Sequence, residues 1–179
     1  VMASELPDLY PGFSIHRLKT SGGEIFARVG GSGPPLVALH GYPQTHVCWH
    51  KIAPELAKSH TLVVMDLKGY GASDAPTGDA DHVTYSKRAM ATCVVEAMAA
   101  LGHTRFVAMG HDRGARVAYR LALDAPDAVS ALVILDILPT GEVFERMRWK
   151  AALTAYHWLF LAQPKPMPET LISASHQAY

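Results

Sequence analysis

The segment best suited to chemistry is 110–115, which reads Gly-His-Asp-Arg-Gly-Ala. This is the spacing of a nucleophile elbow, a sharp turn between a strand and a helix, with Asp112 at the position usually held by serine. An apolar run of strand type, 104–109, precedes the turn, and apolar residues follow it at helical spacing. Gly110 and Gly114 permit the tight turn. Asp112 is therefore expected at a helix N-terminus, where the helix dipole favours the ionised carboxylate.

An ionised aspartate attacks differently from a serine. It needs no base before it attacks a saturated carbon, so it could displace a halide or open an epoxide and be left as an alkyl ester. Hydrolysis of that ester then requires a general base, normally a histidine held by an acid, and backbone N–H donors that face the oxyanion.

Composition narrows the function classes. The 179 residues include 16 basic and 16 acidic side chains, and 49% are hydrophobic. This charge balance argues against a nucleic-acid partner and against a polybasic membrane contact. No signal-peptide pattern and no apolar run of about 18 residues is visible, so a cytoplasmic location and no membrane partner are expected. Cys48 and Cys93 lack metal-ligand spacing and are interpreted as packing residues.

Neither a metal nor an organic cofactor is expected. His46 and His50 form an i, i+4 pair close to His40, but no third ligand stands at metal spacing. The glycines at 30–33 and 69–71 do not complete the dinucleotide-binding pattern.

The elements that must position Asp112 follow an α/β pattern. Strands are predicted at 13–18, 24–29, 36–39, 61–65, 104–109 and 131–135, and helices at 47–57, 86–101 and after the elbow. The alternation predicts a mostly parallel sheet with crossover helices. From 140 onwards the composition changes to an aromatic-rich helix, 142–161, and a proline-rich run. We therefore expect a core over 1–139 and the start of a helical cap, or lid, over 140–179.

Four segments together resemble the α/β-hydrolase superfamily: the His-Gly-Tyr-Pro loop at 40–43, the glycine-rich turn at 66–73, the Asp112 elbow and Asp-Ile-Leu-Pro at 136–139. Within it, segments 110–116, 156–158 and 161–164 look most like fluoroacetate (haloacetate) dehalogenases, with epoxide hydrolases next. The resemblance implies the α/β-hydrolase fold, in which the C-terminal strands and helix of the family lie beyond this chain.

Two arginines beside Asp112 favour an anionic substrate. Arg113 and Arg116 are three residues apart on the predicted helix, so both could clamp a substrate carboxylate. They would also offset its repulsion by Asp112; the alternative is two solvated arginines on an outer helix face. Arg113 argues against simple haloalkanes, because haloalkane dehalogenases of the same superfamily typically have tryptophan there.

The resemblance assigns the remaining roles. His157 and Trp158 match the halide-binding pair, although an aromatic stripe can also be simple packing. The backbone N–H groups of Tyr42 and Arg113 match the oxyanion donors. Asp136, which directly follows a predicted strand, matches the acid that orients the catalytic histidine, although a turn aspartate is the alternative.

The base itself is not found. In the family the catalytic histidine follows the lid, and only His157 and His176 come after Asp136 here. The sheet is also expected to end in an open apolar edge at 131–135. We therefore expect the remainder of a longer polypeptide, and a homodimer would match the look-alikes.

Three hypotheses follow. In the first, Asp112 displaces halide from a small anionic 2-haloacid. In the second, the chain is part of an epoxide hydrolase, for which Tyr156 and Tyr179 could supply the proton. In the third, it is a non-catalytic carboxylate-binding module.

Overall fold

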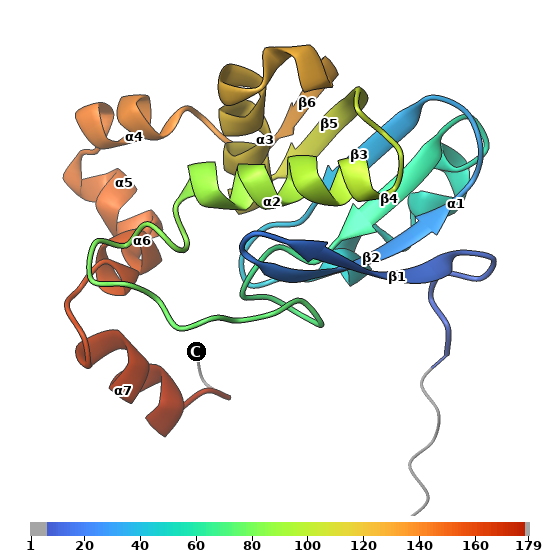
Figure 1. The fold of residues 1–179 in the computed structure, drawn as a ribbon. Helices are drawn as coiled ribbons and strands as arrows, with labels where there is room; N and C mark the ends of the chain where they lie inside the picture. Colours follow the sequence, from blue (N-terminus) through green and yellow to red (C-terminus); the bar gives the residue numbers. More distant parts are fainter. Residues whose placement is uncertain (1–6, 178–179) are drawn as a thin grey trace, which may run out of the picture. The chain divides into compact units, whose positions relative to one another are not determined.

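The computed structural model describes residues 7–177, which divide into two compact units between Ile137 and Leu138 (Figure 1). The first unit contains the sheet and the helices that cover it, and the second contains helices. The division falls two residues before the boundary expected from the change in composition.

The sheet has six strands: β1 (Ser14–Thr20), β2 (Gly23–Gly30), β3 (Pro35–Leu39), β4 (Thr61–Met65), β5 (Phe106–His111) and β6 (Val129–Leu135). Their order is β1-β2-β4-β3-β5-β6. The pairs β1–β2 and β2–β4 are antiparallel, and the other pairs are parallel, so the predicted mostly parallel α/β sheet is confirmed. Leu39 of β3 lies opposite Gly110 of β5. This register places the 40–43 loop and the elbow at the same edge of the sheet.

The first unit's helices are η1 (His46–Trp49, 3-10), α1 (Ala53–Leu56), α2 (Lys87–Ala100), α3 (Arg113–Asp124) and η2 (Pro126–Ala128, 3-10). The continuous helix predicted over 47–57 is wrong, because η1 and α1 are separate. Pro54 explains the break: it lacks the N–H that would bond to the His50 carbonyl, so it is accommodated only in the first turn of α1. Helix α2 begins where the Ser86 hydroxyl accepts the N–H of Ala89.

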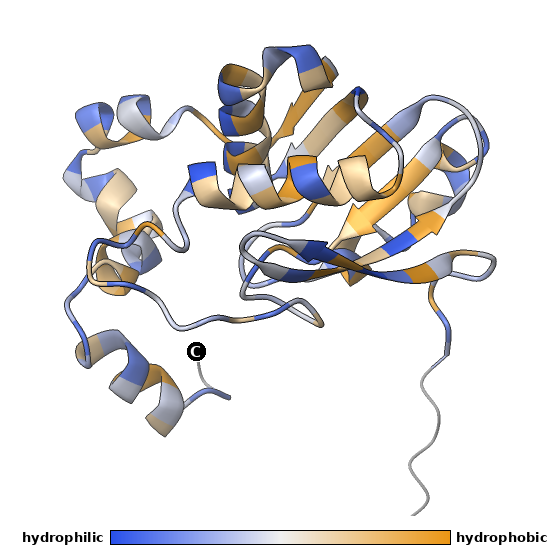
Figure 2. Ribbon diagram, in the orientation of Figure 1, coloured by the Kyte–Doolittle hydropathy of each residue, from blue (hydrophilic) through white to orange (hydrophobic). Residues whose placement is uncertain are grey.

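Alternating strand residues form a core on each face of the sheet. Val37 and Val63 pack with α2 and α3 on one face, and Leu36 and Leu62 pack with Trp49 on the other. Figure 2 shows the hydrophobic residues gathered along the central strands. Because side chains from other elements cover both faces of the sheet, the sequences of the central strands are nearly continuous apolar runs.

The two cysteines differ in burial. Cys93 lies in α2 and is 2% exposed, whereas Cys48 lies in η1 and is exposed. The interpretation of Cys48 as a buried packing residue is therefore wrong, because the short 3-10 turn leaves its side chain at the surface.

The outer edge of β6 is open among the residues described here. Leu132, Val133, Ile134 and Leu135 are each 38–42% exposed, although they belong to a sheet. This is the apolar edge expected from the sequence.

The second unit consists of α4 (Thr140–Arg146), α5 (Trp149–Thr154), α6 (Tyr156–Leu161) and α7 (Met167–Ala174). The single long helix predicted over 142–161 is wrong. The Phe144 and Trp158 rings lie 5.6 Å apart, whereas on one straight helix 14 residues would separate them by about 21 Å. The chain turns at Met147, whose backbone is extended, so that the two aromatic rings meet. Across both units, the described helices are too short or too polar to cross a bilayer.

Candidate active site around Asp112

The elbow holds Asp112 in a strained backbone conformation. Its φ and ψ are 46° and −116°, values that cost a non-glycine residue about 1–3 kcal/mol. Its N–H donates to the Leu135 carbonyl of β6 (3.2 Å), and its carbonyl accepts the N–H of Arg116 (3.1 Å), which starts α3. Asp112 is thus the residue before α3, fixed on one side by the sheet and on the other by the helix.

Glycines make this turn possible through close backbone contacts. A β-carbon on Gly114 would lie 2.2 Å from the Leu39 carbonyl oxygen, and one on Gly110 would lie 2.5 Å from the backbone of Gly114. A β-carbon on Gly41 would lie 2.7 Å from that of Asp112. Strand β3, the 40–43 loop and the elbow therefore approach one another more closely than any side chain would allow.

The Tyr42 backbone N–H donates to Asp112 Oδ2 at 2.9 Å. One carboxylate oxygen thus already occupies the place where an ester carbonyl oxygen would sit, facing a donor that could stabilise an oxyanion. Arg113 is the first residue of α3, so its N–H is one of the donors that have no partner within the helix. The two backbone groups expected as oxyanion donors therefore flank Asp112.

The two arginines occupy different environments. The Arg113 guanidinium lies 4.5 Å from the Tyr42 ring centroid and donates to the Tyr70 hydroxyl at 3.1 Å. Arg116 is 7% exposed, and burial lowers its pKa, a shift opposed by the charge of the Asp112 carboxylate. Neither guanidinium is a solvated group on an outer helix face.

Lys87 adds a third cation that the sequence did not identify. Burial, together with the positive charges of Arg113 and Arg116, lowers its pKa to about 8, although the Asp112 carboxylate opposes the shift. Lys87 is the first residue of α2, so only the packing of α2 beside α3 brings its charge to this site. Asp112 therefore lies near three cations, whose combined field would attract an anion.

A polar chain connects the elbow to the residues on either side of it. His111 Nδ1 lies 3.1 Å from Gln44 Oε1, which also accepts the N–H of Gly41 at 3.1 Å. His111 Nε2 lies 3.7 Å from Asp136 Oδ2. Asp136 follows β6 with a positive φ of 55°, and its side chain is 89% exposed. No spacing pattern in the sequence points to Gln44 or His111, because these contacts join segments that are far apart in the chain.

Asp66, which directly follows β4, anchors the glycine-rich turn through hydrogen bonds. This fully buried carboxylate accepts the N–H of His46 (2.6 Å), the His46 ring Nδ1–H (2.9 Å) and the N–H of Ala72 (2.9 Å). Burial opposes its ionisation, yet the hydrogen bonds from His46 and Ala72 hold its pKa below the ordinary value. The turn that carries Tyr70 is thus anchored to the core.

The expected halide pair lies in the second unit. His157 and Trp158 are neighbours in α6, where the Trp158 ring packs against Phe144 and the His157 ring lies 6.0 Å from that of Tyr156. Tyr179, the second proton donor weighed for an epoxide hydrolase, lies outside the described residues.

Comparisons with known proteins agree with this architecture. Residues 34–164 match the family model for the alpha/beta hydrolase fold. A fluoroacetate dehalogenase of Burkholderia sp. is 45% identical over 171 residues, which are 96% of this chain and 56% of that protein. A soluble epoxide hydrolase of Corynebacterium sp. (strain C12) is 40% identical over 125 residues, which are 69% of this chain and 42% of that protein.

Among solved structures, a Nostoc sp. PCC 7120 protein proposed to be an alpha/beta hydrolase superposes with a TM-score of 0.91 at 50% identity, covering 93% of this chain and 57% of that one. The chain thus spans about half the length of the curated relatives it matches. With the Asp112 elbow, the mostly parallel sheet and the matching family model all in place, this chain belongs to the α/β-hydrolase family.

Proposed function

We propose that the protein containing this chain is a hydrolase that cleaves the carbon–halogen bond of a small 2-haloacid, with Asp112 as the nucleophile. The observation that carries the proposal is the Asp112 carboxylate at the elbow, with Oδ2 held by the Tyr42 N–H. A carboxylate so placed attacks a saturated carbon directly.

In the first step, Asp112 Oδ1 attacks the halogen-bearing carbon, a carbon–oxygen bond forms, and the carbon–halogen bond breaks to release a halide ion. In the second step, water attacks Cγ of Asp112, and the oxyanion forms on Oδ2, where Tyr42 N–H already donates. The bond between Cγ and Oδ1 then breaks, so that a 2-hydroxyacid leaves with Oδ1 as its hydroxyl oxygen.

The charge around Asp112 supports an anionic substrate. A haloacid brings a second carboxylate close to the first, and the two would repel each other strongly without compensation. Arg113, Arg116 and Lys87 supply positive charge near Asp112. The 45% identity to a fluoroacetate dehalogenase supports the same substrate class.

The proposal also includes the remaining roles, which the resemblance to the family implies. His157 and Trp158 would donate N–H groups to the departing halide. Fluoride in particular is a poor leaving group without such donors. Asp136 would orient the histidine that activates water, and that histidine is expected in sequence beyond residue 179. Without it, the ester on Asp112 would persist.

An epoxide hydrolase is the second candidate, supported by the 40% identity to a soluble epoxide hydrolase. The same Asp112 attack would open the ring, and a phenol such as that of Tyr156 would protonate the alkoxide. The cations around Asp112 offer no advantage for a neutral epoxide, which is why this candidate ranks second. A non-catalytic carboxylate-binding module is the third.

The test is a search for the ester. We would incubate the 179-residue chain with chloroacetate, digest it and analyse the Asp112 peptide by mass spectrometry. A carboxymethyl ester on Asp112, absent in Asp112→Asn, is expected. Asp127, an exposed aspartate elsewhere in the same unit, provides the matched control: Asp127→Asn should leave the adduct unchanged.

Other outcomes identify the alternatives. An adduct with styrene oxide but none with chloroacetate would favour the epoxide hydrolase. If neither reagent modifies Asp112 in a chain whose circular dichroism shows the expected helix and strand content, the nucleophile assignment is wrong and the binding module remains.

A further inference from the structure

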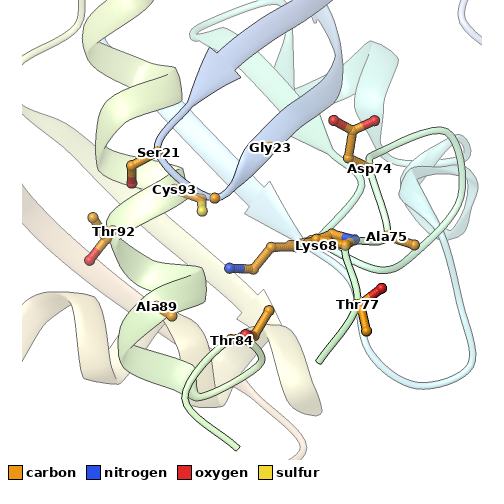
Figure 3. A pocket seen from close by; sticks show the side chains of 12 residues that line it. Ser21, Gly23, Lys68, Asp74, Ala75, Thr77, Thr84, Ala89, Thr92 and Cys93 are labelled. Atoms are coloured by element: carbon orange, nitrogen blue, oxygen red, sulfur yellow. The ribbon is translucent and has the colours of Figure 1, made fainter. Parts of the chain in front are cut away.

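A pocket of about 770 Å³ opens in the first unit, and it is lined by residues other than those around Asp112. Its walls are the turn between β1 and β2, the segment 74–77 after the glycine-rich turn, Thr84, and the N-terminal half of α2 (Figure 3). Tyr42, Lys87, Asp112, Arg113 and Arg116 do not line it. The pocket is within the usual size range for small-molecule sites, about 300–1,000 Å³.

Lys68 is a cationic group that lines this pocket. The residue is only 4% exposed, and among residues 7–177 its ammonium has neither a hydrogen-bond acceptor nor a carboxylate partner. Its one recorded contact is with the Tyr85 ring, 5.9 Å from the centroid. One ring at this distance leaves the charge of the ammonium largely uncompensated by protein groups. An anion that enters the pocket could therefore pair with Lys68.

The surroundings show where that anion would sit. Figure 3 shows the Lys68 side chain crossing the pocket towards α2, with its nitrogen directed away from Asp74. Asp74 also lines the pocket, where its Oδ2 accepts the N–H of Glu24 at 2.8 Å. A β-carbon on Gly22 would lie 2.7 Å from Lys68 Nζ and 2.5 Å from Cys93 Sγ. Because Gly22 has no side chain, the ammonium and the Cys93 thiol can both pack closely against the β1–β2 turn.

The rest of the lining fits an organic anion better than a bare inorganic ion. The Thr84 and Thr92 hydroxyls already donate, to Asp79 Oδ2 and to the Arg88 carbonyl, so they add no obvious donors. Ala75, Pro76 and Ala89 contribute apolar surface. The volume is many times that of a single water molecule, about 30 Å³.

We propose that this pocket is a second ligand site, separate from the Asp112 site, for a small organic anion whose carboxylate pairs with Lys68 and whose hydrocarbon part lies on Ala75, Pro76 and Ala89. The site is independent of the proposed hydrolytic function, because none of its residues is assigned to that reaction.

The probe is hexanoate, titrated by calorimetry into the complete polypeptide that carries this chain, in an Arg116→Met background that keeps the repelling Asp112 carboxylate, so that anion binding near Asp112 is weakened. Lys68→Met should weaken hexanoate binding at least tenfold. Lys51→Met, which removes one exposed charge, should not change it. Hexanol lacks the carboxylate, and inorganic phosphate lacks the hydrocarbon part, so each should bind at least tenfold more weakly than hexanoate.

A second variant tests the volume without touching the charge. Ala89→Leu would fill the pocket from the first turn of α2 and should also weaken hexanoate binding at least tenfold, even if Lys68→Met does not fold. Equal hexanoate affinity in the wild-type, Lys68→Met and Ala89→Leu proteins would overturn the site, as would no binding of hexanoate at all. Phosphate binding as tight as hexanoate binding would overturn the organic part of the ligand.

Discussion

The close contact between the elbow helix and strand β3 gives the sharpest structural prediction. In Gly114→Ala the new methyl group would lie 2.2 Å from the Leu39 carbonyl oxygen and 2.5 Å from that of His40. An ordinary van der Waals contact starts at 3.4 Å, and both neighbours are backbone atoms that cannot rotate away. Helix α3 must therefore move about 1 Å away from β3.

The magnitude follows from this displacement. Overpacking a well-packed site costs about 1–3 kcal/mol, and a rigid backbone neighbour puts Gly114→Ala near the upper value, about 3 kcal/mol. A domain with about 5–15 kcal/mol of stability remains folded after such a loss. A shift of about 1 Å at a reacting group can cost about 100-fold in rate, so ester formation on Asp112 should slow by that factor.

Urea unfolding and the rate of chloride release from chloroacetate would measure the two effects in the complete polypeptide. Gly141→Ala is the matched control: Gly141 lies in α4 with nothing within 4 Å of the new methyl group. There, the same substitution should stabilise by about 0.5–1 kcal/mol, because alanine is the better helix former. A Gly114→Ala protein within about 0.5 kcal/mol of wild type, with an unchanged rate, would refute the account of the elbow.

Three further predictions concern the charges. Arg116→Met should raise KM for chloroacetate about 10- to 100-fold, because it removes a charged hydrogen bond worth about 1.5–3 kcal/mol. KM for the neutral chloroacetamide should not change. An equal rise in KM for both substrates would mean that Arg116 is only structural. Because the pKa of Lys87 is lowered to about 8, its positive charge is present below that pH and lost above it. KM for chloroacetate should therefore rise as the pH passes 8, and Lys87→Met should remove this step from the pH profile; a step that persists would belong to another group. Asp66→Asn should lower the free energy of unfolding, measured with urea, by about 2–4 kcal/mol, because the buried Asp66 carboxylate accepts three hydrogen bonds from His46 and Ala72. A loss below about 1 kcal/mol would contradict that role.

The strands and the elbow could be predicted from the sequence because their signals are local. The apolar run before Gly110 and the helical spacing after Gly114 identify the turn without any knowledge of the rest of the fold. The long helix over 142–161 could not be judged in this way. The chain turns at Met147, and Phe144 and Trp158 come into contact, which a helical spacing pattern does not reveal.

The same limit explains the site residues that were missed. Lys87 lies 25 positions before Asp112, and its charge matters only because α2 packs beside α3. Tyr70 contacts Arg113, and Gln44 contacts His111. Both contacts arise because the order of strands in the sheet brings separate turns together. Such residues carry no spacing pattern, because their partners come from other loops.

The central claim, a covalent ester on Asp112 that water cleaves at Cγ, is tested most directly with isotopic oxygen. The complete polypeptide would turn over excess chloroacetate in H₂¹⁸O, and the Asp112 peptide would be analysed by mass spectrometry. The proposed route predicts ¹⁸O in the Asp112 carboxylate and, in a single turnover, unlabelled oxygen in the glycolate released. Label in the glycolate after one turnover, with none in Asp112, would contradict it, because water would then have attacked the substrate carbon directly.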